Sequence, residues 1–476
     1  MKRLKRPSMA VLLALPLFLN GCMVNQAKDV ETYRQVLDAG APKPAGQFHS
    51  EDPLTLRRAL RLANARNEQL AISGEDYLQA LINEDRAFSA FLPTISFAPA
   101  FMRQEKTALA ADNPLIASFV PDKTTDVQVQ GGLNLHPLRD LSAFRSAGFS
   151  ARMQKALLLD ARSVILLDVA KTYFHVMSSE KRIQALTYSV KVQRRRLNDA
   201  RVKYSAGAVR HLDVSLAEDG LAKVNEALIQ AKNDERNGRA MLALLIGAPS
   251  VDGPLTGGME VRPGVWRVRD LLALAEDRRQ DLAAARAQVR AASAALESAW
   301  GEYFPSVSLN LTRYLSRQSF PSDVDWTSLI QVNVPVFSAG LIHADVRAAY
   351  SRLRQARLAE LSLRRQVLKD LRVAVEDLSD DGRQAKELEV QVETARERVR
   401  QARAGVDAGA GTDLGLMSAQ DRLSSSSLAL AVKRFDMDVD YLRLLRMAGV
   451  LDPGLSVRLG QAKSPLPDGR VAKTGY

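Results

Sequence analysis

The sequence has a single cysteine, Cys22, and aromatic residues make up only 6% of its 476 residues. A lone cysteine excludes an internal disulfide and a metal site built from several thiolates. No apolar run reaches about 18 residues, so the chain is not a polytopic helical membrane protein. An apolar content of 46% is too high for a mostly disordered chain, and the length allows one large or two to three ordinary domains.

The sequence also lacks the marks of a catalytic or metal site. Its five histidines are dispersed, without the paired spacing of metal ligands: His49, His136, His175, His211 and His343. Residues 409–415 (GAGTDLG) superficially resemble a phosphate-binding loop, but they follow a predicted helix and contain no lysine. We therefore expect no enzyme activity, no catalytic residue, no metal and no cofactor.

The formal net charge is +12, from 66 Lys and Arg against 54 Asp and Glu. Lys2, Arg3, Lys5 and Arg6 supply four of these positive charges, and 12 minus 4 leaves +8 for the rest of the chain. Such a mild and interspersed charge does not indicate nucleic acid as a partner.

The pattern of residues at the N-terminus is typical of a targeting segment. Basic residues in 1–8 precede an apolar run over 9–19, which has signal-peptide length and is too short to span a bilayer. The LNGC segment that ends at Cys22 resembles the bacterial lipobox, which implies a lipoprotein signal peptide over 1–21 and acylation of Cys22. The resemblance to bacterial lipoproteins also implies that Met23, a residue other than Asp, permits sorting to the outer membrane. The alternative is an ordinary secretory signal with an incidental cysteine.

Two long stretches without proline dominate the rest of the chain, at 138–248 and 336–452. Both are rich in helix formers, and proline inside a helix costs about 3 kcal/mol or more. Apolar residues between Leu371 and Val406 recur at spacings of three and four, which is typical of a coiled-coil seam. These stretches predict long helices over 141–204 and 341–404, each followed by a turn and a further helix.

Between the helical stretches, apolar and polar residues alternate. The alternation predicts strands at about 94–103, 125–136, 305–314 and 326–336. Each has about the length of a tilted transmembrane strand, and the polar positions are mostly Gln, Ser, Asn and Thr. The alternative is a soluble sheet with one face exposed to solvent, but the solvent-exposed face of such a sheet normally carries Lys, Glu or Asp. We favour membrane strands with one face toward a water-filled lumen.

The chain is internally duplicated, because FLPTISF at 91–97 matches YFPSVSL at 303–309 and SAGA at 205–208 matches DAGA at 407–410. We divide it into an anchored extension, a first repeat, a linker in an equatorial region, a second repeat and a tail: 22–52, 53–250, 251–266, 267–450 and 451–476. The second helices of the repeats are predicted at 212–247 and 414–449, and shorter helices at 69–91 and 281–303.

Element lengths suggest how these parts assemble. The long helices would each span about 96 Å, and a short and a medium helix together about 89 Å, so these can stack end to end beside a long one. Four strands cannot close a barrel, and an open sheet edge does not occur in lipid. The chain must therefore oligomerise, and the arithmetic leaves both a dimer and a trimer open.

The order of these features resembles the TolC-like outer-membrane factor (outer membrane efflux protein) family, lipoprotein type, over roughly 53–450. The resemblance rests on the paired FLP and YFP motifs, on Pro137 and Pro335 closing strands, and on the two glycine turns followed by 212–214 and 414–416. It implies a mainly α fold with a transmembrane β part. In a homotrimer, a 12-stranded β-barrel would continue into a long periplasmic α-helical barrel.

The same resemblance implies a passive exit duct of a tripartite efflux system that expels small molecules. The duct would sit in Gram-negative outer-membrane lipid, lipid-anchored and extending into the periplasm, and dock to a periplasmic adaptor (membrane fusion protein) and an inner-membrane transporter. One alternative is the outer-membrane component of type I protein secretion. Another is a lipid-anchored periplasmic coiled-coil scaffold or adaptor, which would lack membrane strands.

The two glycine turns resemble the periplasmic tips of that family, which implies a gate there. Gly207 and Gly409 permit a left-handed backbone, and the tip residues that we assign to the gate are Gly207, Arg210, His211, Asp213, Gly409 and Asp413. Asp213 sits where the family often places an aspartate facing the pore constriction. The matching position in the second repeat is Gly415, which has no carboxylate. The resemblance therefore does not decide whether the pore has a second acidic ring. The alternative role for Asp213 is a helix-start carboxylate.

Overall fold

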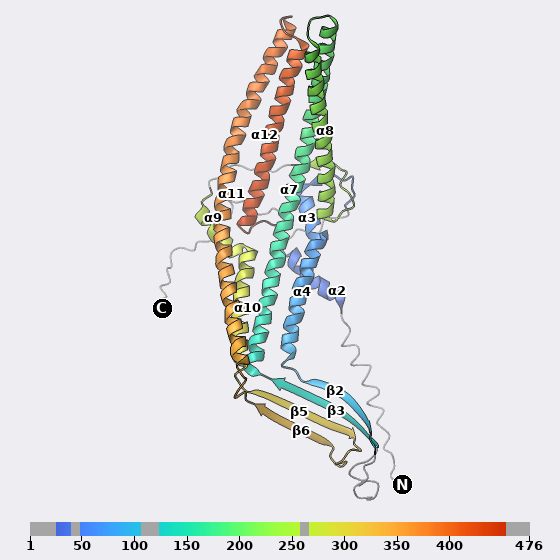
Figure 1. The fold of residues 1–476 in the computed structure, drawn as a ribbon, viewed down its shortest axis with the longest axis vertical. Helices are drawn as coiled ribbons and strands as arrows, with labels where there is room; N and C mark the ends of the chain where they lie inside the picture. Colours follow the sequence, from blue (N-terminus) through green and yellow to red (C-terminus); the bar gives the residue numbers. More distant parts are fainter. Residues whose placement is uncertain (1–24, 40–47, 106–122, 258–265, 454–476) are drawn as a thin grey trace.

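The computed structural model describes residues 25–39, 48–105, 123–257 and 266–453. Cys22, the signal segment and most of the C-terminal tail lie outside these residues. The described chain is a long, narrow bundle of helices with a small sheet at one end (Figure 1). Within the described ranges, no helix combines the length and the apolar character needed to cross a membrane.

Two very long helices run the length of the bundle. Helix α7 is Pro137–Ser205, with 69 residues, and helix α11 is Leu341–Asp407, with 67 residues. Each spans about 100 Å. Strand β3 ends at Leu135, so Pro137 follows the end of that strand as predicted, and it is also the first residue of α7. Proline fits there because the first helical N–H has no partner within the helix.

Shorter helices flank the long ones. They are α2 (Gln26–Asp38), α3 (Leu56–Arg66), α4 (Glu68–Ser89), α8 (His211–Ile246), α9 (Val268–Arg278), α10 (Gln280–Gly301) and α12 (Asp413–Met447). Helices α4, α8 and α10 pack against α7, and α10 and α12 pack against α11. The predicted helices at 69–91, 212–247, 281–303 and 414–449 are thus present within a few residues. Helix α2 was not predicted, and it lies within the extension at 22–52.

The end-to-end stacking of shorter helices is built the same way in both repeats. At the first junction, Asn67 Nδ2 donates a hydrogen bond to the Leu245 carbonyl at 2.9 Å. At the second, Arg279 Nη1 donates to the Met447 carbonyl at 3.4 Å. Each bond joins the start of one helix to the last turn of another, so α8 with α4, and α12 with α10, form continuous columns beside the long helices (Figure 1).

A glycine makes each junction possible. Gly247, with φ 63°, follows α8, and a Cβ there would lie 2.7 Å from the Arg66 carbonyl oxygen. Gly449, with φ 74°, follows α12, and a Cβ there would lie 2.7 Å from the Arg278 carbonyl carbon. Both the left-handed backbone and the close approach require a residue without a side chain.

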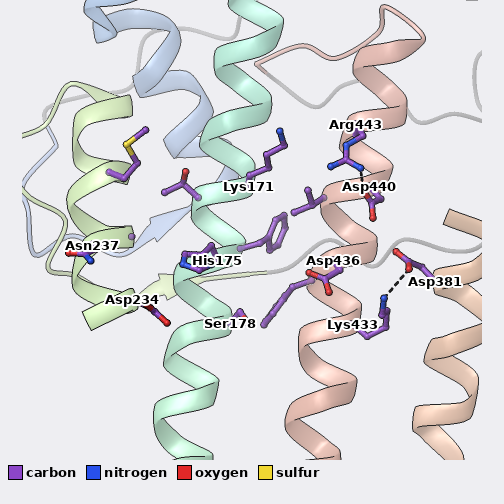
Figure 2. Close-up of a pocket in the computed structure, with 16 residues that line it drawn as sticks. Lys171, His175, Ser178, Asp234, Asn237, Asp381, Lys433, Asp436, Asp440 and Arg443 are labelled. Carbon is purple, nitrogen blue, oxygen red and sulfur yellow. Dashed lines mark hydrogen bonds and ion pairs between the residues drawn. The ribbon is translucent and has the colours of Figure 1, made fainter. Parts of the chain in front are cut away.

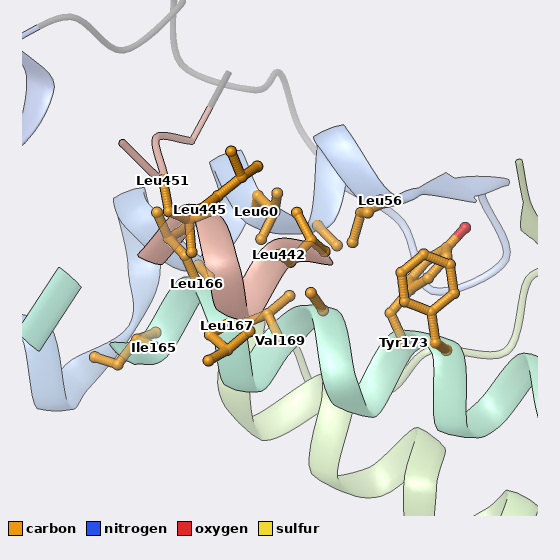
Figure 3. Close-up of a cluster of buried hydrophobic side chains, with 14 of the residues drawn as sticks. Leu56, Leu60, Ile165, Leu166, Leu167, Val169, Tyr173, Leu442, Leu445 and Leu451 are labelled. Carbon is orange, nitrogen blue, oxygen red and sulfur yellow. The ribbon is translucent and has the colours of Figure 1, made fainter. Parts of the chain in front are cut away.

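The main hydrophobic core lies at the waist of the bundle, where α3, α7 and α12 meet (Figure 3). The Tyr173 hydroxyl lies 2.8 Å from the Leu54 carbonyl oxygen and 2.9 Å from that of Thr256. It thereby bonds to both strands of a small parallel sheet, β1 (Leu54–Thr55) and β4 (Leu255–Thr256). The linker predicted at 251–266 therefore contains a strand, which is too short to leave a periodic pattern.

The second sheet has four antiparallel strands in the order β2-β3-β5-β6. They are β2 (Thr94–Arg103), β3 (Lys123–Leu135), β5 (Ser306–Ser316) and β6 (Trp326–Asn333). Strand β6 ends three residues before the predicted boundary at 336. Pro335 has no N–H to donate to a neighbouring strand, which explains the early end. Strands β2 and β6 form the two edges of the sheet.

Candidate functional site

The register of the sheet places the alternating residues on two chemically different faces. Leu133 lies opposite Leu309, and Leu309 lies opposite Ile330, so these three side chains share one face. On the other face, Gln130 lies opposite Ser96 in one neighbour and Thr312 in the other. The alternation therefore runs in phase across all four strands. One face is a continuous apolar surface, and the other is mostly uncharged and polar.

The apolar face is uncovered in a single chain. Ile95 is 77% exposed, Ile330 is 69% exposed and Phe97 is 63% exposed. Nor is either edge strand paired on its outer side within the described chain. A sheet of this kind cannot remain open in lipid, because each unpaired backbone group there costs several kcal/mol. The sheet therefore needs edges supplied by further copies.

The first glycine turn joins α7 to α8 at the far end of the bundle (Figure 1). Gly207 has φ 71°, and the next residue, Ala208, donates its N–H to the Lys203 carbonyl at 2.8 Å. The Asp213 carboxylate accepts a hydrogen bond from the Arg210 backbone N–H at 3.0 Å. Asp213 thus caps the first turn of α8, as the helix-start reading predicts.

His211 is the first residue of α8, and its ring meets the ring of Tyr204 edge-on, with 5.5 Å between centroids. Arg210 is 81% exposed, and its Nε lies 4.0 Å from an Asp213 oxygen. The contact between these two exposed charges is worth little in water. The side chains of the first turn are therefore held mainly by helix capping and ring packing.

The second turn joins α11 to α12 and has the same backbone form. Gly409 has φ 73°, and the hydroxyl of Thr412 accepts the N–H of Gly415 at 3.0 Å, so Thr412 caps α12. Asp413 is the exposed first residue of that helix. A Cβ on Gly411 would lie 2.8 Å from the Gly405 carbonyl carbon, so the tight turn requires glycine at 411.

The two repeats are joined near these turns by polar contacts between α7 and α12. Tyr188 bonds to Gln420, Ser189 bonds to Asp421, and Arg196 Nη2 donates to Ser418 Oγ at 2.8 Å. We call these three pairs the α7–α12 ladder. Its members lie more than 200 residues apart in the sequence. No local pattern marks them, and our sequence analysis did not identify the ladder.

A recess of about 760 Å³ lies between α7, α8 and α12 (Figure 2). The rings of Phe174 and Phe435 line the recess and stack with their centroids 5.9 Å apart. Lys433 Nζ lies 2.9 Å from an Asp381 oxygen, and His175 also lines the recess. The described residues contain no cluster of histidine, cysteine and carboxylate side chains suited to a metal ion.

One carboxyl of this recess has a strongly altered affinity for protons. Burial, with contributions from the carboxylates of Asp381 and Asp377, raises the pKa of Asp440 to about 6, although Arg443 opposes the shift. Burial also raises the pKa of Asp436. Arg443 Nη1 lies 2.7 Å from an Asp440 oxygen. The recess thus concentrates carboxyl groups that water cannot fully solvate.

The predicted site residues fall into separate places. The residues of the two glycine turns gather at one end of the bundle, and the membrane-type sheet lies at the other, about 100 Å away by helix length (Figure 1). Cys22 lies outside the described residues. Within the described residues, the glycine turns and the sheet therefore form two separate candidate sites at opposite ends of the bundle.

Comparison with known proteins agrees with this geometry. The family model described as "Outer membrane efflux protein" matches residues 57–248 and 271–450, which is most of the chain and coincides with the two repeats. The chain belongs to the outer membrane efflux protein family. Members of this family are channels, and the protein is accordingly an outer-membrane exit duct for efflux or secretion that extends into the periplasm.

Individual proteins are similar to this chain in sequence or in fold. The alkaline protease secretion protein AprF of Pseudomonas aeruginosa is 25% identical over 412 residues, covering 80% of this chain and 83% of AprF. The CmeC outer membrane channel of Campylobacter jejuni has a TM-score of 0.71 at 14% identity, covering 88% of this chain and 91% of CmeC. The MtrE outer membrane channel of Neisseria gonorrhoeae has a TM-score of 0.68 at 18% identity, covering 86% and 96%.

Proposed function

We propose that three copies of this outer membrane efflux protein form a passive duct for small molecules. Each copy supplies the four strands β2, β3, β5 and β6, so three copies give a 12-stranded barrel. Strand β2 of one copy would pair with β6 of the next, which satisfies both open edges. The observation that carries the proposal is the in-phase register, which gives each copy one lipid-compatible and one water-compatible face.

The helical part continues this duct through the periplasm. The stacked columns α8–α4 and α12–α10, together with α7 and α11, form an open wall about 100 Å long in one copy (Figure 1). Three such walls would close into an α-helical barrel. At its far end, the turns at Gly207 and Gly409 would dock to a periplasmic adaptor and an inner-membrane transporter.

In this proposal the same far end is the gate. Asp213, Asp413, Arg210 and His211 surround the two turns, and the α7–α12 ladder holds the helix pairs of one copy together between the turns and the waist. Opening would separate the pair α7/α8 from the pair α11/α12. The energetic requirement is modest, since a closed state favoured by a few kcal/mol is almost fully populated.

We also propose that Cys22 carries the lipid anchor of the mature protein. The support is the lipobox-like LNGC segment and the absence of any other cysteine from the sequence. Helix α2 begins four residues after Cys22 and packs on α4 near the waist, so the anchored extension is held to the bundle soon after the anchor. Labelling with a radioactive fatty acid, with Cys22→Ser as control, tests the modification.

A second candidate function is export of a polypeptide as the outer-membrane component of type I secretion. The observation that favours it is the similarity to AprF, which is named for secretion of alkaline protease and is matched over most of both chains. The periplasmic scaffold considered from the sequence is not proposed, because membership in the outer membrane efflux protein family places the chain in the outer membrane.

One pair of assays separates the two functions. A deletion strain should accumulate a fluorescent efflux dye and become more sensitive to antibiotics, while its secreted proteins stay unchanged by mass spectrometry. The reverse result, with a lost secreted protein and unchanged dye accumulation, would replace efflux with polypeptide secretion. Native mass spectrometry of the purified protein tests the assembly, and any stoichiometry other than three would contradict the 12-stranded barrel.

A further inference from the structure

A groove of about 370 Å³ lies along the seam between α7 and α10, in the half of the bundle nearer the sheet. Part of its lining is apolar. Ala156 and Ala287 are buried there, and Phe149 and Leu159 are half-buried. This volume suits a small organic molecule, and pockets for such molecules are lined mainly by apolar side chains.

Four exposed cations line the same groove. Arg152 and Lys155 come from α7, and Arg286 and Arg290 come from α10. The guanidinium carbon of Arg152 lies 5.3 Å from the centroid of the Phe149 ring, which holds this charge beside the apolar lining. Within the described residues, no acidic side chain lines the groove. The groove therefore combines an apolar surface with concentrated positive charge.

The register of the two helices gives the spacing of these charges. The Ser146 hydroxyl of α7 donates to the Ala291 carbonyl of α10 at 2.9 Å, and a second bond nearer the sheet shows that the helices run antiparallel. Arg290 therefore lies one residue from the level of Ser146, and Lys155 marks the other end of the charged stretch. The cations are spread over about 12 Å along the seam at 1.5 Å per residue. A ligand with two or more acidic groups matches this spacing.

The described protein leaves most of this charge unbalanced. Arg152, Lys155 and Arg290 have no ion pair with a described residue. Arg286 Nε lies 3.9 Å from an oxygen of Glu360, but both side chains are about a third exposed or more, so that contact is weak. Arg286 and Arg290 are also one helical turn apart, where like charges repel. A bound anion would relieve this repulsion.

The groove is complete in a single copy. Helix α7 packs against both α4 and α10, and α10 packs against both α7 and α11 (Figure 1). The seam between α7 and α10 therefore lies inside the wall that one copy forms, and not at an edge where a neighbouring copy would pack. Each copy has its own groove.

The groove opens on the side of the wall that carries α2. Lys155 and Arg162 are seven residues apart and so lie on one stripe of α7. Arg162 Nη1 donates to the Leu37 carbonyl of α2 at 2.9 Å. In the proposed duct α2 follows the lipid anchor and lies outside the barrel, so the groove faces the periplasm and not the path of the cargo. This placement rests on the proposed function, whereas binding to the groove does not.

We propose that this groove binds an amphipathic organic anion from the periplasm, with a flat apolar body and two or more acidic groups. The apolar body would lie against Phe149 and Leu159. Its carboxylate, sulfonate or phosphate groups would contact the four cations, since guanidinium groups bind such anions in a bidentate manner and Lys155 adds a point charge. The apolar lining is the argument for an organic anion, because an inorganic anion would leave that lining uncovered.

Fluorescence anisotropy of the purified full-length protein in a neutral detergent tests this proposal. The probe is methoxypyrene trisulfonate, a flat aromatic trianion whose permanent charges keep it out of neutral micelles. We expect saturable binding of one probe per chain. Naphthalene disulfonate should displace the probe at concentrations at least about tenfold lower than tripolyphosphate, which carries charge without an apolar body. Equal displacement by the two competitors would overturn the proposal.

The triple variant Arg152→Gln/Lys155→Gln/Arg290→Gln removes three of the cations. It should bind the probe at least about tenfold more weakly than the wild type. It should also assemble like the wild type on a gel of unheated samples, because all three side chains are exposed. Unchanged binding of the probe by this variant would overturn the proposal.

A matched control removes the same charge elsewhere on α7. Lys191, Arg194 and Arg195 are exposed and lie about 55 Å along the helix from the groove. Lys191→Gln/Arg194→Gln/Arg195→Gln should therefore bind the probe like the wild type. An equal loss in both triple variants would show that net charge alone attracts the probe, which would overturn the proposal. Binding is counted per chain and assembly is read separately, so failure here is distinct from failure of the trimeric duct.

Discussion

Tyr33 lies across Gly74 so closely that a Cβ atom on Gly74 would sit 2.4 Å from Cδ2 of the ring. Gly74 is in the middle of α4, and Tyr33, which is 4% exposed, is in the middle of α2. Glycine inside a helix is unfavourable by about 1 kcal/mol relative to alanine. Its presence here is explained by the ring that it accommodates, and the contact fixes helix α2 to the bundle.

The first prediction follows from this contact. Gly74→Ala should displace Tyr33 and loosen α2, because overpacking of this kind costs about 1–3 kcal/mol. Limited trypsin digestion should then cleave α2 at Arg34 about tenfold faster, since Arg34 is otherwise bonded to the Ala65 carbonyl at 3.0 Å. Gly382→Ala in α11, where a Cβ meets no atom within 4 Å, is the control and should leave cleavage unchanged. Equal cleavage in both variants would show that the contact between Tyr33 and Gly74 does not hold α2 in place.

The second prediction tests the two faces of the sheet. Leu311 lies midway along the apolar face, and its neighbour Asn310 lies on the polar face. Leu311→Arg should cost about 2–4 kcal/mol near the bilayer midplane and abolish assembly. Asn310→Arg should assemble normally, because its charge faces water. Oligomers on gels of unheated samples provide the measurement, and equal assembly of the two variants would mean that the faces are assigned wrongly.

The sequence predicts the elements of this fold well because strong periodicities specify them. Four strands with alternating polarity and two long stretches without proline leave clear signals, and the duplication repeats each of them. The observed boundaries differ from the predicted ones by a few residues. Helix α7, for example, begins at Pro137 and not at the predicted residue 141. The strands β1 and β4 left no signal, since each has only two residues and their partners, including Tyr173, are far away in the chain.

The candidate site was less predictable for a physical reason. Asp213 could be placed at a helix start, and its hydrogen bond to Arg210 confirms the capping role. The partners in the α7–α12 ladder, such as Arg196 and Ser418, are ordinary polar residues. They meet only because the two repeats pack against each other, so the sequence alone does not mark them. The raised pKa of Asp440 likewise arises from burial against Asp381, which periodicity does not reveal.

The third prediction concerns pH. In the folded chain the pKa of Asp440 is raised to about 6 from an ordinary value of 3.8. The folded state therefore binds the proton more tightly, so Asp440 contributes stability that is present below about pH 4 and lost as the pH rises through about 6. Asp440→Asn resembles the protonated form and should raise the unfolding free energy at pH 7.5 by about 1–2 kcal/mol.

Thermal unfolding in detergent at pH 5 and pH 7.5 measures this effect. The stabilisation by Asp440→Asn should shrink at pH 5, where the wild-type carboxyl is already mostly protonated. Asp219→Asn, at an exposed carboxylate of α8, is the control and should show no comparable change between the two pH values. A pH-independent difference for Asp440→Asn would show that the carboxyl is ionised in the folded protein throughout this range.

The fourth prediction tests the gate through the α7–α12 ladder. The double variant Tyr188→Phe/Asp421→Ala removes both close contacts, to Gln420 and from Ser189, while leaving the glycine turns intact. Each lost hydrogen bond is worth about 0.5–1.5 kcal/mol, and three copies would lose both. The closed state should therefore become less populated. Single-channel recordings in planar bilayers should show larger or more frequent conductance, and cells should become more sensitive to large antibiotics.

The control for the gate is the adjacent hydroxyl of Thr187. It is exposed and donates to the Ile183 carbonyl of its own helix at 2.7 Å. Thr187→Val should therefore leave the conductance unchanged while altering the same turn of α7. If the double variant also conducts like the wild type, the ladder does not hold the pore closed. Larger conductance in Thr187→Val as well would point to general loosening of α7, because that change leaves the three hydrogen-bonded pairs of the ladder in place.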